Sequence, residues 1–195
     1  MQIQSAMATT IEEQSNKNIY WHYTTLERFA EIMESGVILP ATAYVGKNEK
    51  PVAWFSANQF WEQTANKSIL LYGQIRGLTR KEMFHLGVAR IGVSIETAPY
   101  DWEGFKKLSG ISNRVSKGLV AAAKNAKSNP KDWRVSFEPV IRDKWLRIEV
   151  WQSGKWESLQ DIAAEADNKD GLQLYFCRAI EVLLNFVNVF GRSYL

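Results

Sequence analysis

A short histidine-bearing strand followed directly by a helix is the feature that most constrains the fold of this chain. If residues 21–25 are extended, the side chains of His22 and Thr24 stand on the same face of the strand. Apolar residues at helical spacing then continue from Leu26 to Ser35, and Gly36 is a typical helix terminator. The sequence therefore predicts a strand and a helix joined without a loop.

A second short strand is predicted about thirty residues further along the chain. After a brief apolar run at 37–40, the segment 52–56 reads Val-Ala-Trp-Phe-Ser, the composition of a strand that ends in a hydroxyl. The polar and aromatic stretch 58–67 follows it at once and fits no regular core element. Its position makes it a candidate rim for a pocket.

The other expected elements follow from apolar periodicity, helix caps and chain breakers. They are a helix capped by Thr79 and Glu82 and closed by Gly87, a strand over 88–95, a helix over 101–107 broken by Gly110, a basic helix over 112–127 ended by Asn129 and Pro130, strands over 133–138 and 145–151, a return strand at Trp156, and an apolar helix over 172–190.

This irregular succession predicts an α+β fold with an antiparallel-rich sheet that is bent or split around a cleft, with helices on its outer faces. It lacks the regular alternation of a doubly wound sheet, and no Gly-x-Gly-x-x-Gly follows any strand, so a Rossmann fold is not expected. We expect a flexible N-terminal arm over 1–17 and a single domain over 18–195.

Composition excludes several kinds of site. The single cysteine, Cys177, rules out an intrachain disulfide, and with only two histidines a zinc site is not expected, so we predict no metal. No apolar run has the length of a membrane span, and the first residues do not resemble a signal peptide. These observations predict a soluble protein of a reducing compartment, the cytoplasm, with no membrane partner.

Positive charge is concentrated in one part of the chain. The formal net charge is only +3, with a pI of about 8.9. Residues 106–134 nevertheless contain eight lysines and arginines and a single acidic residue, Asp132. Two interpretations stay open for this basic segment: a solvated helical face, or a surface that binds phosphate groups.

The order of histidine strand, glycine-ended helix and aromatic-serine strand resembles the entrance to the NAD pocket of the ADP-ribosyltransferase superfamily, in its histidine–tyrosine–glutamate branch. Over 19–67 the resemblance is clearest, and it extends loosely over 132–151. The segment after the second strand is also similar to uncharacterised bacterial and phage proteins. The resemblance implies a split sheet around an NAD cleft.

By this resemblance, His22 binds a ribose hydroxyl of NAD, Thr24 supports the same strand end, and main-chain groups near Tyr23 bind the nicotinamide amide. Trp54 or Phe55 takes the place of the stacking tyrosine of the family, and Ser56 ends the strand that carries it. Because that tyrosine is replaced, Tyr44 and Tyr72 are alternatives for the same role.

The family also places a glutamate at the start of a late strand. Glu138 fits this placement, because Ser136 stands two residues before it and apolar residues follow. Glu149 is the competing candidate, although its position in a strand also favours an ion pair with Arg147 or with a cation of a neighbouring strand. Glu62 is a further alternative.

Three functions are compatible with these residues. The first is an NAD-dependent ADP-ribosyltransferase that modifies a protein or a nucleic acid, in phage–host or toxin conflict. The second is a catalytically silent module with the same fold that binds a nucleotide, a single strand or a peptide. The third is an NAD glycohydrolase, with water as the acceptor. The sequence leaves the acceptor and the oligomeric state open.

Overall fold

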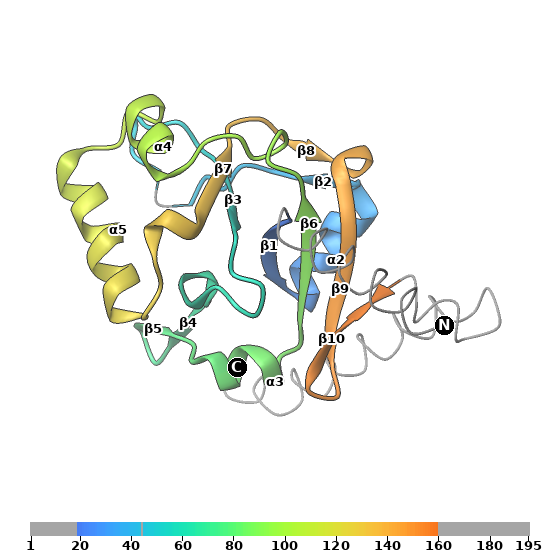
Figure 1. Cartoon of the computed structure of the whole chain (residues 1–195). Helices are drawn as coiled ribbons and strands as arrows, with labels where there is room; N and C mark the ends of the chain where they lie inside the picture. The colour runs from blue at the N-terminus through green and yellow to red at the C-terminus, as the bar shows by residue number, and fades with distance from the viewer. Residues whose placement is uncertain (1–18, 44, 160–195) are drawn as a thin grey trace, which may run out of the picture. The chain divides into compact units, whose positions relative to one another are not determined.

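The computed structural model describes residues 19–43 and 45–159, and it shows a mixed α+β protein with mostly antiparallel strands (Figure 1). The α+β class predicted from the sequence is thereby confirmed. The predicted arm at 1–17, the apolar helix at 172–190, Tyr44 and Cys177 lie outside the described residues.

The described chain divides into two compact units. The first contains residues 19–22, 37–64 and 92–146, and the second contains residues 23–36, 65–91 and 147–159. Three strands, β1 (Tyr20–Thr25), β6 (Val88–Val93) and β9 (Trp145–Gln152), contribute residues to both units.

In the first unit, three strands lie side by side. β1 pairs antiparallel with β3 (Ala53–Ser56), and β3 pairs antiparallel with β7 (Trp133–Ser136). A second, two-stranded sheet joins β2 (Val37–Ile38) to β8 (Val140–Ile141).

Two helices of the first unit, α4 (Trp102–Leu108) and α5 (Asn113–Asn125), follow Asp101 and Ser112, whose side chains accept hydrogen bonds from the helix N-terminal amides. Their buried residues pack with those of β7, and Figure 1 shows α4 and α5 on the same side of the first unit as β7. Aromatic and small side chains form this core: Val52, Trp102, Phe105, Ala123, Trp133 and Val135.

The second unit contains two helices and two hairpins. Its helices are α2 (Leu26–Ser35) and α3 (Arg80–His85), and its hairpins are β4 (Ser68–Leu71) with β5 (Gln74–Gly77) and β9 (Trp145–Gln152) with β10 (Lys155–Ser158). β9 neighbours β6 on its other side. Single-turn 3₁₀ segments lie at Gln63–Ala65, Pro130–Asp132 and Arg142–Lys144.

Helix bounds agree closely with those predicted from caps and breakers. α2 starts after Thr25, which caps it, and ends at Gly36 with a positive φ of 70°. In α3 the reciprocal hydrogen bonds between Thr79 and Glu82 form the predicted capping box. Hydrogen bonds from Arg76 and then from Thr79 lower the pKa of Glu82 to about 2.

Two parts of the fold differ from the sequence-based expectation. The stretch 58–67, expected at a pocket rim, contributes Trp61 and Glu62 to the interior, where they are 1% and 5% exposed. The β4–β5 hairpin was not predicted, because the residues of β5 are all exposed and show no apolar alternation.

We predict that Gly110→Ala lowers the free energy of unfolding by more than the roughly 1–2 kcal/mol that an alanine costs in the left-handed backbone conformation. The φ of Gly110 is +75°, and an added Cβ would lie 2.5 Å from the main-chain oxygen of Asn48. The hydrogen bond of 2.7 Å from Lys50 N to Ser109 O holds the two segments together, so the clash has little room to relax.

The matched control is Gly154→Ala, where φ is +88° and nothing lies within 4 Å of the added Cβ. Urea unfolding gives the loss of unfolding free energy in each variant. The Gly154 variant reports the backbone cost alone, and the additional loss in the Gly110 variant reports the clash. Equal losses of unfolding free energy would contradict the close approach at Gly110.

Candidate functional site

His22 is held by the neighbouring strand. Its Nδ1 lies 3.0 Å from the main-chain oxygen of Trp54, and its ring packs against Phe55 at a centroid distance of 5.7 Å. A carbonyl oxygen only accepts, so Nδ1 carries the proton in this bond. The tautomer and the orientation of the half-buried imidazole are therefore set by β3.

The strand register divides the predicted binding residues between two faces of the sheet. Trp21 is paired directly with Ser56, and directly paired antiparallel residues point to the same face. His22 therefore points to the face opposite Ser56, and its ring contact with Phe55 agrees with this. Trp54, two residues before Ser56, shares the face of Ser56.

The aromatic residues proposed to stack on nicotinamide already have protein partners. The Trp54 ring lies 4.8 Å from that of Phe105 and 5.8 Å from that of Trp133, measured between centroids. Phe55 is only 2% exposed. Tyr72 is 86% exposed at the turn of the β4–β5 hairpin in the second unit.

Ser56 belongs to a buried cluster of hydroxyl groups around the carboxylate of Glu62. Ser56 Oγ donates to Glu62 Oε2 at 2.8 Å, and Thr64 donates to Oε1 from both its main-chain nitrogen, at 3.1 Å, and its hydroxyl, at 2.6 Å. Ser128, which follows α5, also donates to Oε1. This hydroxyl cage, consisting of Ser56, Thr64 and Ser128, fixes the loop after β3.

Glu62 is one of three buried charged residues in the described part of the chain, with Arg90 and Glu149. Among the described residues no lysine or arginine forms a salt bridge with it, and its charge is stabilised by neutral donors instead. A buried carboxylate of this kind is a candidate functional group as well as a structural one. The sequence indicated Glu62 only as an alternative. Its contact with Ser128 joins residues 66 positions apart, and a local pattern in the sequence does not show such a contact.

The neighbour of this cage is Asp132. Burial, together with the negative charge of Glu62, raises the pKa of the Asp132 carboxyl, although Arg134 opposes the effect. The main-chain oxygen of Asp132 accepts a 2.7 Å hydrogen bond from Ala57 N, which keeps the two acidic segments together.

Glu138 lies in the same unit, two residues after β7, and its side chain is exposed. Ser136 Oγ accepts a hydrogen bond from Glu138 N and donates one to Glu138 O, so the turn is held by main-chain groups of the glutamate. No salt bridge to its carboxylate occurs among the described residues.

The second unit contains the other predicted residues. Thr24 is buried, and the hydroxyl of Tyr23 accepts a 3.4 Å hydrogen bond from Arg90 Nη1. Arg90 Nε also donates to Glu149 Oε2 at 2.6 Å, while Arg147 lies 2.9 Å from Oε1. The buried carboxylate of Glu149 is thus neutralised by two guanidinium groups, as its sequence position suggested.

These environments distinguish the two predicted catalytic carboxylates. Both oxygens of Glu149 are engaged by arginines, and the Arg90 guanidinium in turn lies 4.5 Å from the centre of the Trp156 ring. Glu138 is exposed and bonded only through its main chain in the contacts described above. As a carboxylate able to meet a ligand, Glu138 is therefore the better candidate.

In the part of the chain that the structure describes, no group of three or more histidine, cysteine or acidic residues is arranged to hold a metal ion. Over the same residues, no helix combines the length and apolar composition required to cross a bilayer.

We predict that Glu149→Gln lowers the free energy of unfolding by about 3–5 kcal/mol, since it leaves the buried charge of Arg90 without its counterion. The double variant Arg90→Met with Glu149→Leu removes both charges and should recover most of the loss. Chemical unfolding of the two proteins provides the measurement. A double variant as unstable as the single one would show that the ion pair is not the cause.

We also predict that Asp132→Asn stabilises the protein at pH 7. The pKa of Asp132 is raised in the folded state, so the folded protein binds this proton more tightly than the unfolded chain does. As the pH rises above the ordinary value of 3.8, the carboxyl loses this proton and the stability that the proton supplied is lost. Asparagine is uncharged at every pH and avoids this loss. The gain should shrink when melting temperatures are compared at pH 3. A gain that is the same at both pH values would contradict the raised pKa.

The chain was compared with protein-family models, with curated proteins and with solved structures. None of the three comparisons found a match.

Proposed function

We propose that this protein is an NAD-dependent ADP-ribosyltransferase that modifies a macromolecule. The observation that carries the proposal is the anchored imidazole of His22, at the position where the resembled family binds the ribose of NAD. Its ring is fixed by the bond to Trp54 O, and the glycine-ended helix α2 follows within the chain. NAD acts as the substrate that donates ADP-ribose.

The tautomer of His22 suits this role. With the proton on Nδ1, the neutral ring has its lone pair on Nε2, which can accept a hydrogen bond from a ribose hydroxyl. A ring that is already oriented loses little conformational freedom when the ligand binds. His22 would hold the ribose without taking part in proton transfer.

The carboxylate is assigned to Glu138 rather than Glu149. In ADP-ribosyl transfer the bond between nicotinamide and ribose breaks, positive charge develops on the ribose, and the acceptor then attacks. A carboxylate near that charge stabilises the transition state more than the ground state. The exposed carboxylate of Glu138 is available for this interaction, whereas Arg90 and Arg147 already engage Glu149.

A second function is favoured by one specific observation. The rings at the stacking positions pack within the protein: Trp54 contacts Phe105 and Trp133, and Phe55 is buried. A site without a free aromatic ring would hold nicotinamide weakly. A catalytically silent module that binds a nucleotide through His22 is therefore the alternative.

We predict that the purified protein binds NAD and releases nicotinamide, faster when a cell extract supplies the acceptor. His22→Ala should weaken NAD binding and reduce turnover at subsaturating NAD to the same extent, because it removes a contact made in both the ground state and the transition state. Glu138→Gln should retain binding and lose about 10²-fold or more in turnover, since its charge acts mainly in the transition state. Calorimetry and release of labelled nicotinamide measure the two effects.

Glu34→Gln is the matched control, because Glu34 is also an exposed glutamate and lies on α2. It should behave as the unmodified protein. Binding without nicotinamide release would identify the silent module, and release without transfer of label would identify a glycohydrolase. Absence of NAD binding in the folded protein would reject the transferase and the glycohydrolase, and would leave only a silent module that binds another nucleotide, a single strand or a peptide.

A further inference from the structure

We infer that the basic face of α5 binds the phosphate backbone of a nucleic acid, without reading its bases. This basic face consists of six cations: Arg114, Lys117 and Lys124 on α5, and Lys107, Lys127 and Lys131 on either side of the helix in the sequence. The inference is independent of NAD chemistry, because none of these residues is among those assigned to ribose binding or catalysis.

Charge is segregated along the chain far more than its net value indicates. The segment 106–134 has eight basic residues and one acidic residue, which leaves 16 basic and 20 acidic residues for the rest of the chain. The segment thus carries a formal charge of +7 and the remainder −4. A solvated surface usually mixes both signs, whereas a phosphate-binding surface concentrates one.

The helix places its three cations in one stripe. At about 100° per residue, Arg114, Lys117 and Lys124 fall within an arc of about 80°, over an axial length of about 15 Å. The buried Ala123 lies on the opposite side of the helix from Arg114. Ala121 stands within the stripe and Gly118 beside it; both are exposed, so a phosphate chain can approach the helix closely.

Within 19–43 and 45–159, no ion pair explains the position of these cations. In the described residues, no carboxylate forms a salt bridge with the basic face, whereas Lys106 pairs with Glu103 at 2.9 Å. A helical face that is merely solvated commonly sets acidic residues three or four positions from its lysines. α5 contains no acidic residue at all.

Arg114 is also unfavourable for the helix itself. It occupies the first turn, where the positive end of the helix dipole repels a cation, and the first turn of α5 contains no acidic residue. A phosphate bound near this end would reverse the penalty. Arg114 thus fits an anionic partner better than it fits the isolated helix, whereas Lys124, in the last turn, is favoured by the helix dipole.

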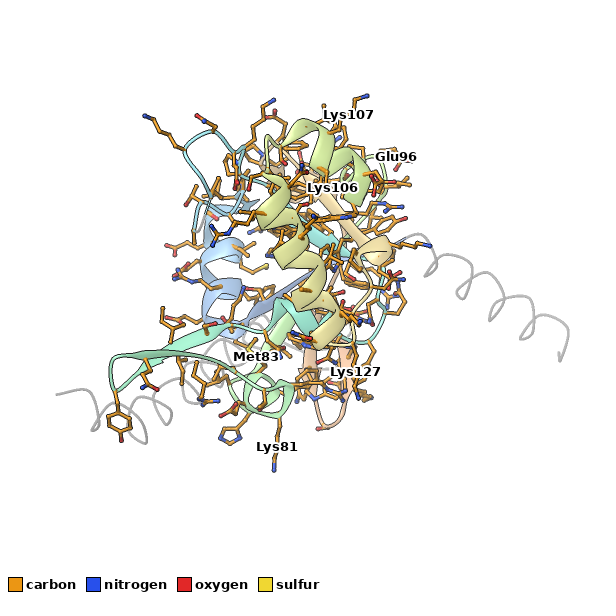
Figure 2. The ribbon with its side chains drawn as sticks, turned by 90° about the vertical axis from the view of Figure 1, so that its left-hand side faces the viewer. Lys81, Met83, Glu96, Lys106, Lys107 and Lys127 are labelled. Atoms are coloured by element: carbon orange, nitrogen blue, oxygen red, sulfur yellow. The ribbon has the colours of Figure 1, made fainter. Side chains whose placement is uncertain are left out.

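The composition of the surface indicates what kind of contact it makes. Residues 107–131 contain no phenylalanine, tyrosine or tryptophan, and the nearby rings of Trp102 and Phe105 are buried in the core. Proteins that hold single strands through their bases need exposed aromatic rings. Figure 2 looks onto α5, with Lys107 on α4 and Lys127 just beyond the end of α5. Such a surface binds backbone phosphates.

The test is binding of a fluorescein-labelled 20-base-pair DNA duplex of random sequence to the full chain, over a range of salt concentrations. We expect log K to fall linearly with log salt concentration. The variant Arg114→Gln/Lys117→Gln/Lys124→Gln should bind about tenfold or more weakly at 0.1 M salt, with a slope smaller by about 2–3. A second duplex of different sequence should bind equally well.

The control Lys47→Gln/Lys81→Gln/Lys144→Gln removes the same charge from exposed lysines elsewhere, including Lys81 on α3 (Figure 2). It should retain most of the affinity. A further variant, Lys107→Gln/Lys127→Gln/Lys131→Gln, leaves α5 unaltered and should also weaken binding. Circular dichroism checks that each variant is folded.

Three results would overturn the inference. The first is no salt-dependent binding of duplex by the folded protein. The second is an equal loss of affinity in the control and in the α5 variant. The third is a poly-glutamate peptide that binds as tightly as the duplex, which would make the face a docking site for an acidic protein instead.

Discussion

The antiparallel pairing of β1 with β3 is the constraint on which the first unit depends. Because Trp21 pairs with Ser56, each neighbouring residue is assigned to one face of the sheet. Trp54 then joins the aromatic core with Trp133, while His22 stands on the other face with Phe55. A slip of one residue would exchange these faces, so the position of the candidate ligand-binding histidine depends on the same register as the packing.

The two buried carboxylates of the described residues are stabilised in different ways. Glu62 accepts hydrogen bonds from neutral groups of Ser56, Thr64 and Ser128, whereas Glu149 is paired with Arg90 and Arg147. Neutral donors leave the negative charge in place, and it is felt by Asp132, while two guanidinium groups cancel it. This difference makes Glu149 a structural element of its unit and leaves Glu62 electrostatically active.

Local signals in the sequence were sufficient for most helices and strands. The cap Thr79 and the terminator Gly36 act within one turn, so they could be read directly, whereas the cap Thr25 was seen only in the structure. The ion pair of Glu149 with Arg147 followed from strand alternation. The contact between Glu62 and Ser128 could not be predicted, because it depends on the packing of segments 66 positions apart. For Trp54 and Phe55 the sequence left a core position and a stacking position equally open, since composition does not reveal which face a strand buries.

Comparison of α3 with α5 shows how differently this chain uses charge on helices. In α3, Glu82 completes the capping box and pairs with Arg76, so its charge contributes to the start of the helix. In α5, the cap is Ser112 and the interior is rich in alanine, and both favour a helix that has no acidic residue. Lys124, in the last turn, is favoured by the helix dipole, whereas Arg114, in the first turn, opposes it. Helix stability therefore does not explain the position of Arg114, and the inferred phosphate contact would supply the negative charge that the first turn lacks.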